Sequence, residues 1–466
     1  MTNHHSLNVH AHFYQPSRVD LLNGSIPDEP GAHPYRNWNE KIYEECYRPN
    51  AELGNFEKIG FNIGPTLNAW LRQHHPETLG LIIQADRENI KKFGVGNAIA
   101  QPYHHTILPL SNQRDKLTQI RWGIYDFEHT FGRSPRGMWL PETAVDLESL
   151  ELLADNGIEF TILAPWQADA HEIDPRKAYQ VILAGHKAIK VIFYHSGLSS
   201  RISFDSAATE NADEFIRKYV KPEFLSGVGD QWLTMASDGE LYGHHQSFRD
   251  KFLSYLLNGS LSIQSLDYSF PALQIQKQTT FPIIKIRDKT SWSCHHGVKR
   301  WQGVCGCTTN GEWKKHLRES LERLAFNLDA VFKQYCDDLQ IDPWKARDGY
   351  VEVFAGGRDF KEWFESSAKI NLTYHEIDIY RSLFEAQLDG QRMFTSCGWF
   401  FEDLDRIEPR NNLAYAAHAV WLVKKATAID LLRDLMPYLE KAKSWRSGLT
   451  AADVFMQAFS RFERSK

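Results

Sequence analysis

The chain has 466 residues, of which 42% are hydrophobic and 24% charged, an ordinary composition for a large globular protein. Its net charge of −6 and its lack of long runs of like charge argue against a nucleic-acid or anionic-membrane partner. No apolar run approaches the length of a membrane span, and no apolar signal core follows the N-terminus, so we expect a soluble, cytoplasmic protein. Six cysteines in so long a chain do not indicate a disulfide framework.

Seven short apolar segments, separated by segments of helical periodicity, predict a parallel sheet whose strands are joined by right-handed crossovers. They are residues 7–13, 58–63, 97–100, 137–140, 160–163, 190–195 and 232–236. Polar residues cluster directly after five of these segments, and a barrel would bring their carboxyl ends together at one mouth. Because seven strands are one short of the usual eight-stranded barrel, we expect an incomplete (β/α)7 barrel.

The chain changes character after the barrel, and we divide it into a catalytic barrel (1–273), a connecting loop (274–311) and a helical domain (312–466). Apolar residues from 317 to 335 repeat at alternating spacings of four and three, which is typical of a helix in a bundle. Further helices are predicted at 376–394, 411–439 and 451–464. The expected fold class is therefore an α/β barrel followed by an α-helical bundle domain.

Local signals add detail to this outline. Residues 17–50 are rich in Pro, Gly, Asn and Tyr and predict a long, ordered loop on the substrate side. Ser111 is placed to cap the long helix that follows it, and Gly185 to turn a hairpin into the sixth strand. Residues 281–287 predict one more strand.

Two carboxylates lead the list of catalytic candidates. Glu142 follows the fourth strand and Asp238 ends the seventh, so a barrel would place both at its mouth. Cleavage of a glycosidic bond needs two carboxyl groups that face each other across the bond, one ionised and one protonated. Asp238 would need an apolar or anionic surrounding to hold a proton near neutral pH, and Glu240 could supply part of it. The alternative is a capping glutamate and a turn aspartate.

His10 and His12 alternate on the first strand, so their side chains point to the same face. On the inner face of a barrel they would reach the pocket, where they could bind a metal or hydrogen-bond to a sugar. Each could equally be a histidine of the core whose ring nitrogens are satisfied by neighbouring side chains.

The connecting loop carries Cys294, His295, His296, Cys305 and Cys307. These residues could form a zinc site, but their spacing matches no standard zinc motif. We favour a folded loop that caps the pocket and whose tryptophans contact ligand or core. An aromatic turn at residues 394–401 is interpreted as a lid over the pocket or as an apolar cluster at the end of the bundle.

Five motifs of the chain resemble those of glycoside hydrolase family 57, and the resemblance covers nearly the whole chain. They lie at residues 10–16, 96–105, 137–142 (Gly-Met-Trp-Leu-Pro-Glu), 237–244 (Ser-Asp-Gly-Glu-Leu-Tyr-Gly-His) and 391–401. In the first, the family's usual His-Gln-Pro is interrupted by Phe13 and Tyr14. The tail, with Cys294 and Cys305-Gly306-Cys307, looks like an uncharacterised branch that carries a C-terminal domain of unknown function.

The resemblance implies a retaining mechanism on α-linked glucose polymers, with Glu142 as the nucleophile and Asp238 as the acid/base. The implied partner is an α-glucan or malto-oligosaccharide, and neither a metal nor another cofactor is assigned to the site. The implied activity is that of an α-amylase, a 4-α-glucanotransferase or a branching enzyme. The expected substrate-binding residues are His10, His12, Gln15, His104, Trp139, Glu240, His244, Trp292 and Trp399.

Two other functions stay open. In a metal-dependent polysaccharide deacetylase-like hydrolase, Asp238, His10 and His12 would hold a metal that activates water. In a non-catalytic sugar-binding protein, the same fold would bind glycans without turnover.

Overall fold

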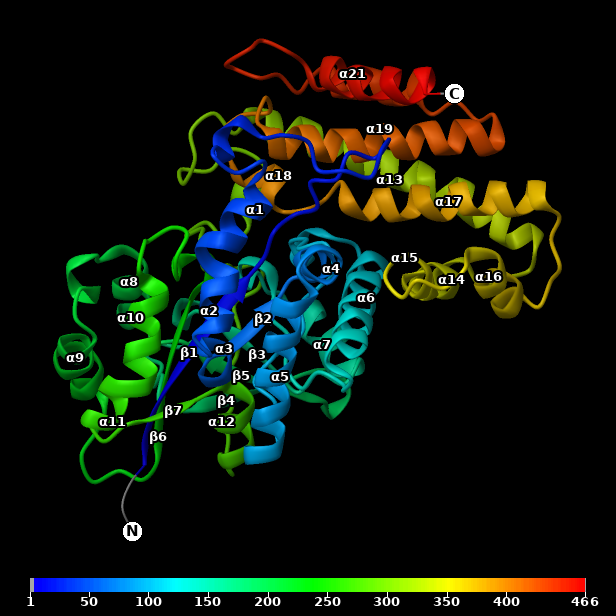
Figure 1. Cartoon of the computed structure of the whole chain (residues 1–466). Coiled ribbons are helices and arrows are strands. Elements are labelled where there is room, and N and C mark those ends of the chain that lie inside the picture. Colours follow the sequence, from blue (N-terminus) through cyan, green and yellow to red (C-terminus); the bar gives the residue numbers. More distant parts are fainter. Residues whose placement is uncertain (1–3, 466) are drawn as a thin grey trace. The chain divides into compact units, whose positions relative to one another are not determined.

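The computed structural model describes residues 4–465, which form two compact units (Figure 1). The first unit contains residues 4–17, 26–102 and 127–292, and the second contains residues 18–25, 103–126 and 293–465. Two segments from the first part of the chain therefore belong with the helical C-terminal part. Within residues 4–465, no helix has both the length and the apolar character that crossing a membrane requires.

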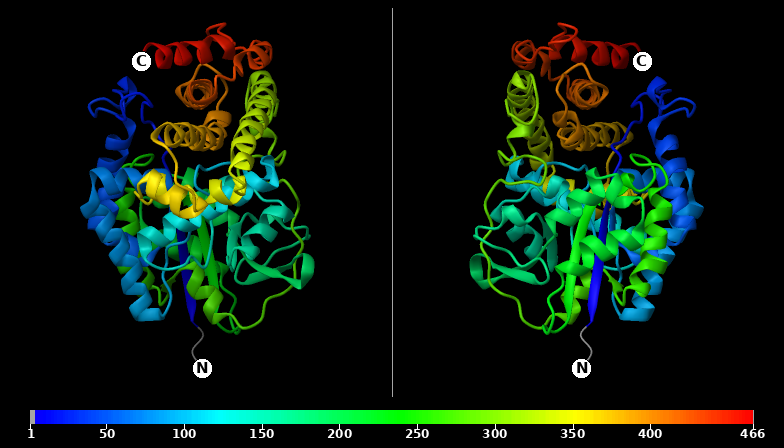
Figure 2. Two further views of the ribbon diagram at one scale, coloured as in Figure 1. Left: turned by 90° about the vertical axis from the view of Figure 1, so that its right-hand side faces the viewer. Right: turned by 90° about the vertical axis from the view of Figure 1, so that its left-hand side faces the viewer.

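The first unit is built on seven parallel strand segments, as the apolar pattern predicted. Five are regular strands: β1 (His5–Phe13), β2 (Gly60–Ile63), β3 (Phe160–Leu163), β5 (Ala188–Phe193) and β6 (Gln231–Asp238). β1 pairs with β2 on one side and with β6 on the other; Figure 2 shows β1 in blue beside β6 in green. Single parallel bridges then connect β2 to Ala98, Ala100 to Met138 and Gly137 to β3, and β3 pairs with β5.

The circle closes between β5 and β6 through a backbone hydrogen bond of 2.7 Å from His195 N to Thr234 O. The predicted (β/α)7 barrel is therefore confirmed, and it is incomplete in that it has seven strand segments where the usual barrel has eight. β4 (Ala178–Ile182) pairs antiparallel with β5 and forms the expected hairpin around Gly185, and the short β7 (Asp267–Ser269) pairs with the first half of β1.

Alternation along β1 places its polar side chains on one face. Leu7, Val9, Ala11 and Phe13 share one face, while Asn8, His10 and His12 share the other, and all seven are buried. Such complete burial is typical of a strand in a barrel covered by helices. These helices are α1 (Trp38–Ile42), α2 (Arg48–Glu52), α3 (Asn55–Lys58), α4 (Pro65–His74), α5 (Pro76–Phe93), α7 (Leu147–Asp155), α8 (Ser196–Phe204), α9 (Ala212–Phe215), α10 (Arg249–Tyr255), α11 (Leu261–Ile263) and α12 (Pro271–Lys277).

The second unit is helical. Its longest helix, α13 (Glu312–Asp338), buries the predicted seam of Leu317, Leu321, Leu324, Leu328 and Val331. α13 packs against α17 (Tyr374–Arg392) and α20 (Leu432–Leu439), and α19 (Ile407–Thr427) packs between α17 and α21 (Ala451–Arg464) (Figure 1). The other helices are α14 (Pro343–Gly349), α15 (Val351–Phe354), α16 (Phe360–Ala368), α18 (Cys397–Phe400) and the part up to Asp126 of α6 (Gln113–Phe131).

Four local predictions were wrong. The segment predicted as a loop to residue 50 is helical from Trp38, because the side chain of Asn37 caps α1. Asn112, rather than Ser111, accepts the capping hydrogen bond at the start of α6, from Asp115 N at 2.9 Å. Residues 281–287 make only isolated bridges instead of a strand. The helix expected at 411–439 breaks at Ala428, which adopts a left-handed conformation with φ of 60°.

Candidate active site in the barrel unit

Glu142 and Asp238 lie at the carboxyl ends of the fourth and seventh strand segments. Glu142 sits in a tight turn with φ of 58° and ψ of 20°, a left-handed conformation that is uncommon for a residue other than glycine. Strain of this kind persists where neighbouring contacts impose it, and it concentrates at functional sites. Trp292 supplies such contacts: its backbone N–H donates to the Glu142 carbonyl at 3.0 Å and its indole Nε1 donates to Glu142 Oε2 at 3.0 Å.

Asp238 is the last residue of β6, and its environment favours the protonated acid. Protein atoms crowd its carboxyl group, and this desolvation raises its pKa from 3.8 to about 8, with further contributions from the negative charges of Glu142 and Glu240. The residue also keeps a solvent-exposed face, so water moderates the size of the shift without reversing its direction. Asp238 can therefore hold a proton near neutral pH.

Glu240, two residues further on, is buried and anchors the segment that follows β1. Its Oε1 accepts hydrogen bonds from Tyr14 N at 3.1 Å and from the Tyr47 hydroxyl at 2.7 Å, and Gln15 also donates to its carboxyl group. Burial raises the pKa of Glu240 to about 7, although these donors oppose the shift. Glu240 and Gln15 thus hydrogen-bond to each other beside the backbone that follows β1, and contact of either residue with substrate stays a prediction.

His10 and His12 are organised by Asn62, which the sequence reading missed. Asn62 Oδ1 lies 3.3 Å from His10 Nε2, and Asn62 Nδ2 lies 2.9 Å from His12 Nδ1 and 2.7 Å from Gln101 Oε1. Since the amide donates to Nδ1 of His12, the neutral ring carries its proton on Nε2. Burial lowers the pKa of both histidines to about 3, so both rings are neutral. The signal for Asn62 was a polar residue in a short, fully buried strand.

The ring of Trp139 stacks on the rings of both histidines. Its ring is fully buried and stacks on His10 at 5.1 Å and on His12 at 5.2 Å, and it meets the edge of Trp292 at 5.1 Å. With no exposed surface, Trp139 orients the histidines and Trp292 instead of presenting its own face. The predicted residues His10, His12, Trp139 and Trp292 therefore form one connected group beside Glu142.

His244 is half-buried near the same end of β6. Its Nδ1 lies 2.6 Å from Glu45 Oε2, and its ring meets the edge of Trp38 at 6.0 Å. Gly243 before it has φ of 135°, and a Cβ there would lie 2.0 Å from the carbonyl oxygen of Glu45. His244 is thus held against the segment that contains α1 and is already paired with a carboxylate.

Two predicted site residues, His104 and Trp399, belong to the second unit. His104 is buried, and its Nδ1 lies 3.1 Å from the amide nitrogen of Gln119. Trp399 is fully buried between the ring of Trp313, at 6.4 Å, and the guanidinium group of Arg318, at 4.6 Å. Packing of this kind favours the interpretation of residues 394–401 as an apolar cluster at the end of the bundle.

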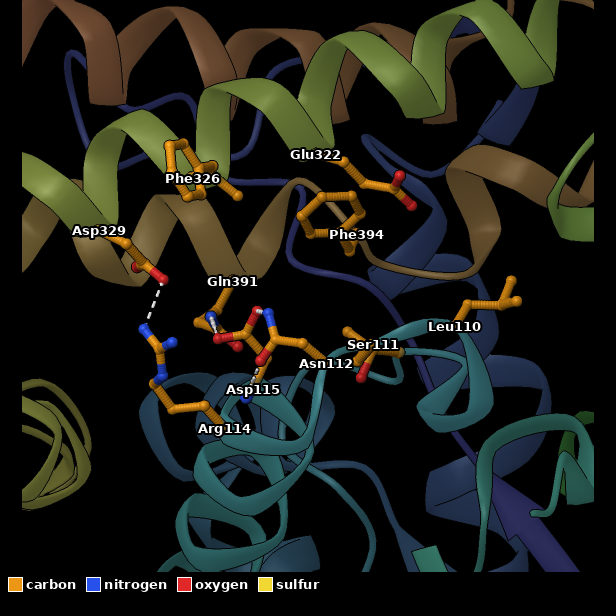
Figure 3. Close-up of a pocket in the computed structure, with 12 residues that line it drawn as sticks. Leu110, Ser111, Asn112, Arg114, Asp115, Glu322, Phe326, Asp329, Gln391 and Phe394 are labelled. Atoms are coloured by element: carbon orange, nitrogen blue, oxygen red, sulfur yellow. Dashed lines mark hydrogen bonds and ion pairs between the residues drawn. The ribbon is translucent and has the colours of Figure 1, made fainter. Parts of the chain in front are cut away.

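The second unit also contains a cavity of about 340 Å³ (Figure 3). Arg114 and Asp329 form an ion pair in its lining, with Nη1 and Oδ2 3.0 Å apart, and Gln391 Nε2 donates to Asp115 Oδ1 at 2.9 Å. Phe394 adds an aromatic wall. Polar groups with an aromatic wall are typical of small-molecule pockets. The fifth motif thus contributes Gln391 and Phe394 to a pocket.

Metal-ligating side chains converge elsewhere. Within residues 4–465, the group of histidine, cysteine and carboxylate side chains placed to hold a metal ion is Cys294, His296, Cys305 and Cys307 in the second unit. The ring nitrogens of His10 and His12 instead meet Asn62. The barrel site thus combines two interacting carboxyl groups, Glu142 and Asp238, with neutral histidines and two tryptophans.

Comparison with known proteins places this geometry in a family. The model described as glycosyl hydrolase family 57 matches residues 4–279, and that of a domain of unknown function (DUF3536) matches residues 310–461. α-Amylase 1 of Dictyoglomus thermophilum is 32% identical over 214 residues, which is 44% of this chain and 29% of that enzyme. A 4-α-glucanotransferase of Thermococcus litoralis is 28% identical over 128 residues, 27% of this chain and 18% of the enzyme. The chain thus covers less than a third of these curated relatives.

Solved structures share the whole fold at low sequence identity. An exo-type maltose-forming amylase of a Pyrococcus species has a TM-score of 0.73 at 14% identity, covering 97% of this chain and 88% of that one. A branching enzyme of Thermococcus kodakaraensis has a TM-score of 0.60 at 14% identity, covering 97% and 96%. The barrel and the helical part therefore occur together in other proteins.

Proposed function

Because the chain belongs to glycosyl hydrolase family 57, we propose that it is a retaining enzyme that cleaves or transfers α-linked glucans. The observation that supports this most directly is the electrostatic coupling between Glu142 and Asp238: the charge of Glu142 contributes to the raised pKa of Asp238. A carboxyl group whose pKa is raised by a neighbouring carboxylate can act as proton donor while that neighbour acts as nucleophile. The substrate class rests on the relatives, which include an α-amylase and a 4-α-glucanotransferase.

In the first step, a carboxylate oxygen of Glu142 attacks the anomeric carbon as the bond to the leaving oxygen breaks, and Asp238 donates its proton to that oxygen. In the second step, ionised Asp238 accepts a proton from water or from the hydroxyl group of an acceptor sugar, whose oxygen displaces Glu142. Water gives hydrolysis, and a sugar hydroxyl gives transfer. Two inversions at the anomeric carbon leave its configuration unchanged.

The surrounding residues prepare these steps. Trp292 holds Oε2 of Glu142 by its indole N–H, which orients the carboxylate and stabilises its charge. Neutral His12 carries a proton on Nε2, because its Nδ1 accepts from Asn62, and this N–H is suited to a sugar hydroxyl. Glu240 keeps the pKa of Asp238 high by its negative charge.

The test is a pair of isosteric variants, Glu142→Gln and Asp238→Asn, assayed on amylose and malto-oligosaccharides. Loss of the nucleophile should lower kcat by about 10³-fold or more, and loss of the acid by about 10²–10⁴-fold. Far-UV circular dichroism and thermal midpoints should match the wild type. Near-normal turnover by either folded variant contradicts the assignment.

Chemical rescue separates the two roles. Asp238→Asn should regain much of its first-step rate on an aryl α-glycoside whose leaving group needs no proton, and Glu142→Gln should not. Azide should intercept the glycosyl intermediate of Asp238→Asn and give an α-glycosyl azide. A β-glycosyl azide from that variant would contradict the retaining mechanism.

Product lengths, resolved by size, then distinguish chain shortening, disproportionation and branching.

The metal-dependent hydrolase gains no support from the barrel site. Its three ligands would be His10, His12 and Asp238, yet Asn62 lies against a ring nitrogen of each histidine.

A further inference from the structure

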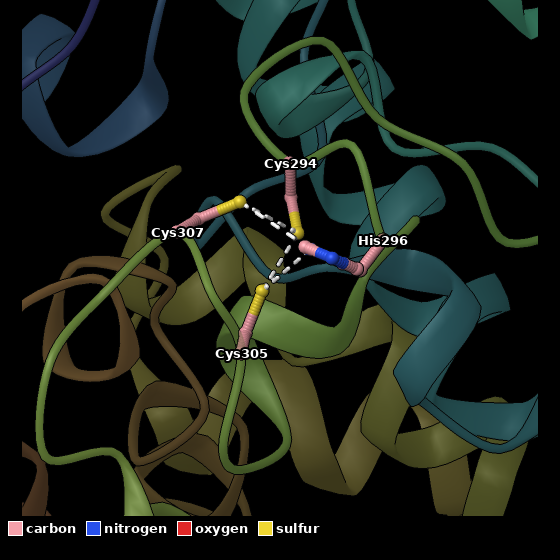
Figure 4. Close-up of side chains that lie close together, drawn as sticks. All are labelled: Cys294, His296, Cys305 and Cys307. Carbon is pink, nitrogen blue, oxygen red and sulfur yellow. Dashed lines mark hydrogen bonds between the residues drawn. The ribbon is translucent and has the colours of Figure 1, made fainter.

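Four side chains from two short turns converge in the second unit (Figure 4). Cys294 and His296 come from one turn, and Cys305 and Cys307 come from the other, with residues 297–304 between them. One ligand atom of each, a sulfur atom or a ring nitrogen, lies within 4.8 Å of all the others. In Figure 4 all four side chains point toward a common centre.

The separations are close to those of a tetrahedral metal site, and two of them are slightly shorter. Sγ of Cys294 lies 3.4 Å from Sγ of Cys305 and 3.8 Å from Sγ of Cys307. Nδ1 of His296 lies 3.1 Å from Sγ of Cys305 and 3.5 Å from Sγ of Cys307. Bond lengths of about 2.3 Å for Zn–S and 2.0–2.1 Å for Zn–N at tetrahedral angles place sulfur atoms about 3.8 Å apart and sulfur and nitrogen about 3.6 Å apart. We propose that Cys294, His296, Cys305 and Cys307 bind one structural zinc ion through three thiolates and one imidazole.

Backbone amides complete the site as they do around zinc-bound thiolates. The N–H groups of His296 and Arg300 donate to the sulfur of Cys294, and the N–H of Cys307 donates to that of Cys305. Such donors stabilise negative charge on sulfur and fix the direction of each ligand.

Two cations lie near the site and offset its negative charge. Three thiolates and a neutral imidazole on Zn²⁺ carry a net charge of −1. The guanidinium group of Arg300 acts on Cys305, and Lys314, which is fully buried on α13, interacts electrostatically with Cys294 and Cys305. Lys314 Nζ also donates to Arg300 O at 3.0 Å, which ties the loop to α13.

A disulfide does not explain the arrangement. The sulfur atoms of Cys294 and Cys305 are 3.4 Å apart, well beyond the S–S bond length of about 2.05 Å. A disulfide would also leave the third cysteine and His296 converging without a partner.

A metal ion would stabilise the fold of this loop, which has little other structure of its own. Between residues 293 and 311 the regular structure is one short turn, Lys299–Trp301, and little apolar surface besides Val298 and Trp301 is buried. Segments with so small a core commonly depend on a metal for their folding energy.

Elemental analysis of the purified full chain tests the proposal, with about one zinc ion expected per chain. His296→Ala and Cys305→Ser should lower the content to about a tenth or less, while the controls His295→Ala and Cys397→Ser should retain it. Because loss of a ligand can also prevent folding, His296→Cys offers a second measurement: four thiolates should still bind zinc and support folding. Retention of zinc by Cys305→Ser, or its loss in His295→Ala, overturns the proposal.

Two further readouts bear on the ligands. Replacement by Co²⁺ should give the thiolate charge-transfer and d–d absorption bands of a tetrahedral sulfur-rich site, and these should disappear in Cys305→Ser. Removal of the metal by a chelator should lower the thermal midpoint of the wild type. Zinc-free wild type with a Cys294–Cys305 disulfide in peptide mass spectra, or bound Co²⁺ without charge-transfer bands, contradicts the assignment.

Discussion

Nε1 of Trp292 donates a hydrogen bond of 3.0 Å to Oε2 of Glu142, and the backbone N–H of the same tryptophan donates to the Glu142 carbonyl at 3.0 Å. One residue thus fixes both the strained backbone and the carboxylate of the proposed nucleophile. Trp292 lies far along the chain from Glu142, at the end of the barrel unit. Its position makes it a positioning residue whose role can be separated from that of the nucleophile.

Trp292→Phe removes the indole donor while keeping an aromatic ring against Trp139. Without this bond the Glu142 carboxylate is no longer held in one orientation, and because misplacement of a reacting group by about 1 Å can cost about 10²-fold, we expect kcat to fall by about 10–100-fold. KM should change little. Steady-state kinetics on malto-oligosaccharides measures both.

Trp166→Phe is the matched control. Its indole donates to the Ser291 carbonyl at 3.0 Å, next to Trp292 in the chain, and has no hydrogen bond to Glu142. This variant should keep kcat within about twofold of the wild type, since removing a neutral hydrogen bond at a half-exposed site costs little. Equal losses in the two variants would indicate a packing role for Trp292.

The pH profile reports the acid. Because the pKa of Asp238 is raised to about 8, kcat/KM should stay high at neutral pH and fall as the pH rises through that value and the proton is lost. Glu240→Gln removes a negative charge that raises this pKa, so the pKa of Asp238 falls and the alkaline limb moves to lower pH.

Glu210→Gln provides the comparison for this shift, because Glu210 is exposed and is not among the charges that act on Asp238. Its alkaline limb should coincide with that of the wild type. An unchanged limb in Glu240→Gln, or a shift to higher pH, would show that another group titrates there.

Gly239→Ala should displace Asp238. A Cβ at position 239 would lie 2.2 Å from the ring of Phe13, which is itself buried on β1. Forced overpacking costs about 1–3 kcal/mol, and it acts here directly beside the proposed acid. We expect a lower thermal midpoint together with a lower kcat.

Gly80→Ala distinguishes this effect from a general intolerance of alanine. Gly80 lies within α5 with open space around its Cβ position, so the change should stabilise the protein by about 0.5–1 kcal/mol and leave turnover unaltered. Normal kcat in Gly239→Ala would mean that Phe13 yields without moving the acid.

Arg347 holds the helical unit together through buried charges. Its guanidinium group is fully buried, with Nη2 2.8 Å from Asp115 Oδ1 and Nη1 3.5 Å from Asp329 Oδ1. Arg347→Met leaves two carboxylates without their buried partner, so the free energy of unfolding should fall by about 3–5 kcal/mol. Urea unfolding measures it.

Arg121→Met is the control on the same unit. Its pair with Asp348, at 2.6 Å, is partly exposed, and such pairs contribute about 1 kcal/mol or less. Similar losses for both variants would contradict a special role for the buried arginine.

Short-range patterns in the chain were enough to locate the strands and the two carboxylates. The alternation in β1 and the apolar run of β6 are visible in the sequence because successive side chains of a strand point to opposite faces, which is a local property of the chain. Glu142 and Asp238 could be chosen because each follows such a strand and because their motifs resemble those of a known family. The seam of α13 was visible for the same reason.

Other contacts form only when the barrel closes and the loop folds, and no sequence pattern predicted them. Asn62 becomes the partner of His10 and His12 because β2 pairs in register with β1, and Trp292 meets Glu142 because the chain returns to the barrel mouth. Cys294, His296, Cys305 and Cys307 converge although their spacing fits no standard zinc motif. Such contacts depend on packing between distant segments, and the pKa of Asp238 depends on them in turn, since burial and the charges of Glu142 and Glu240 act through space.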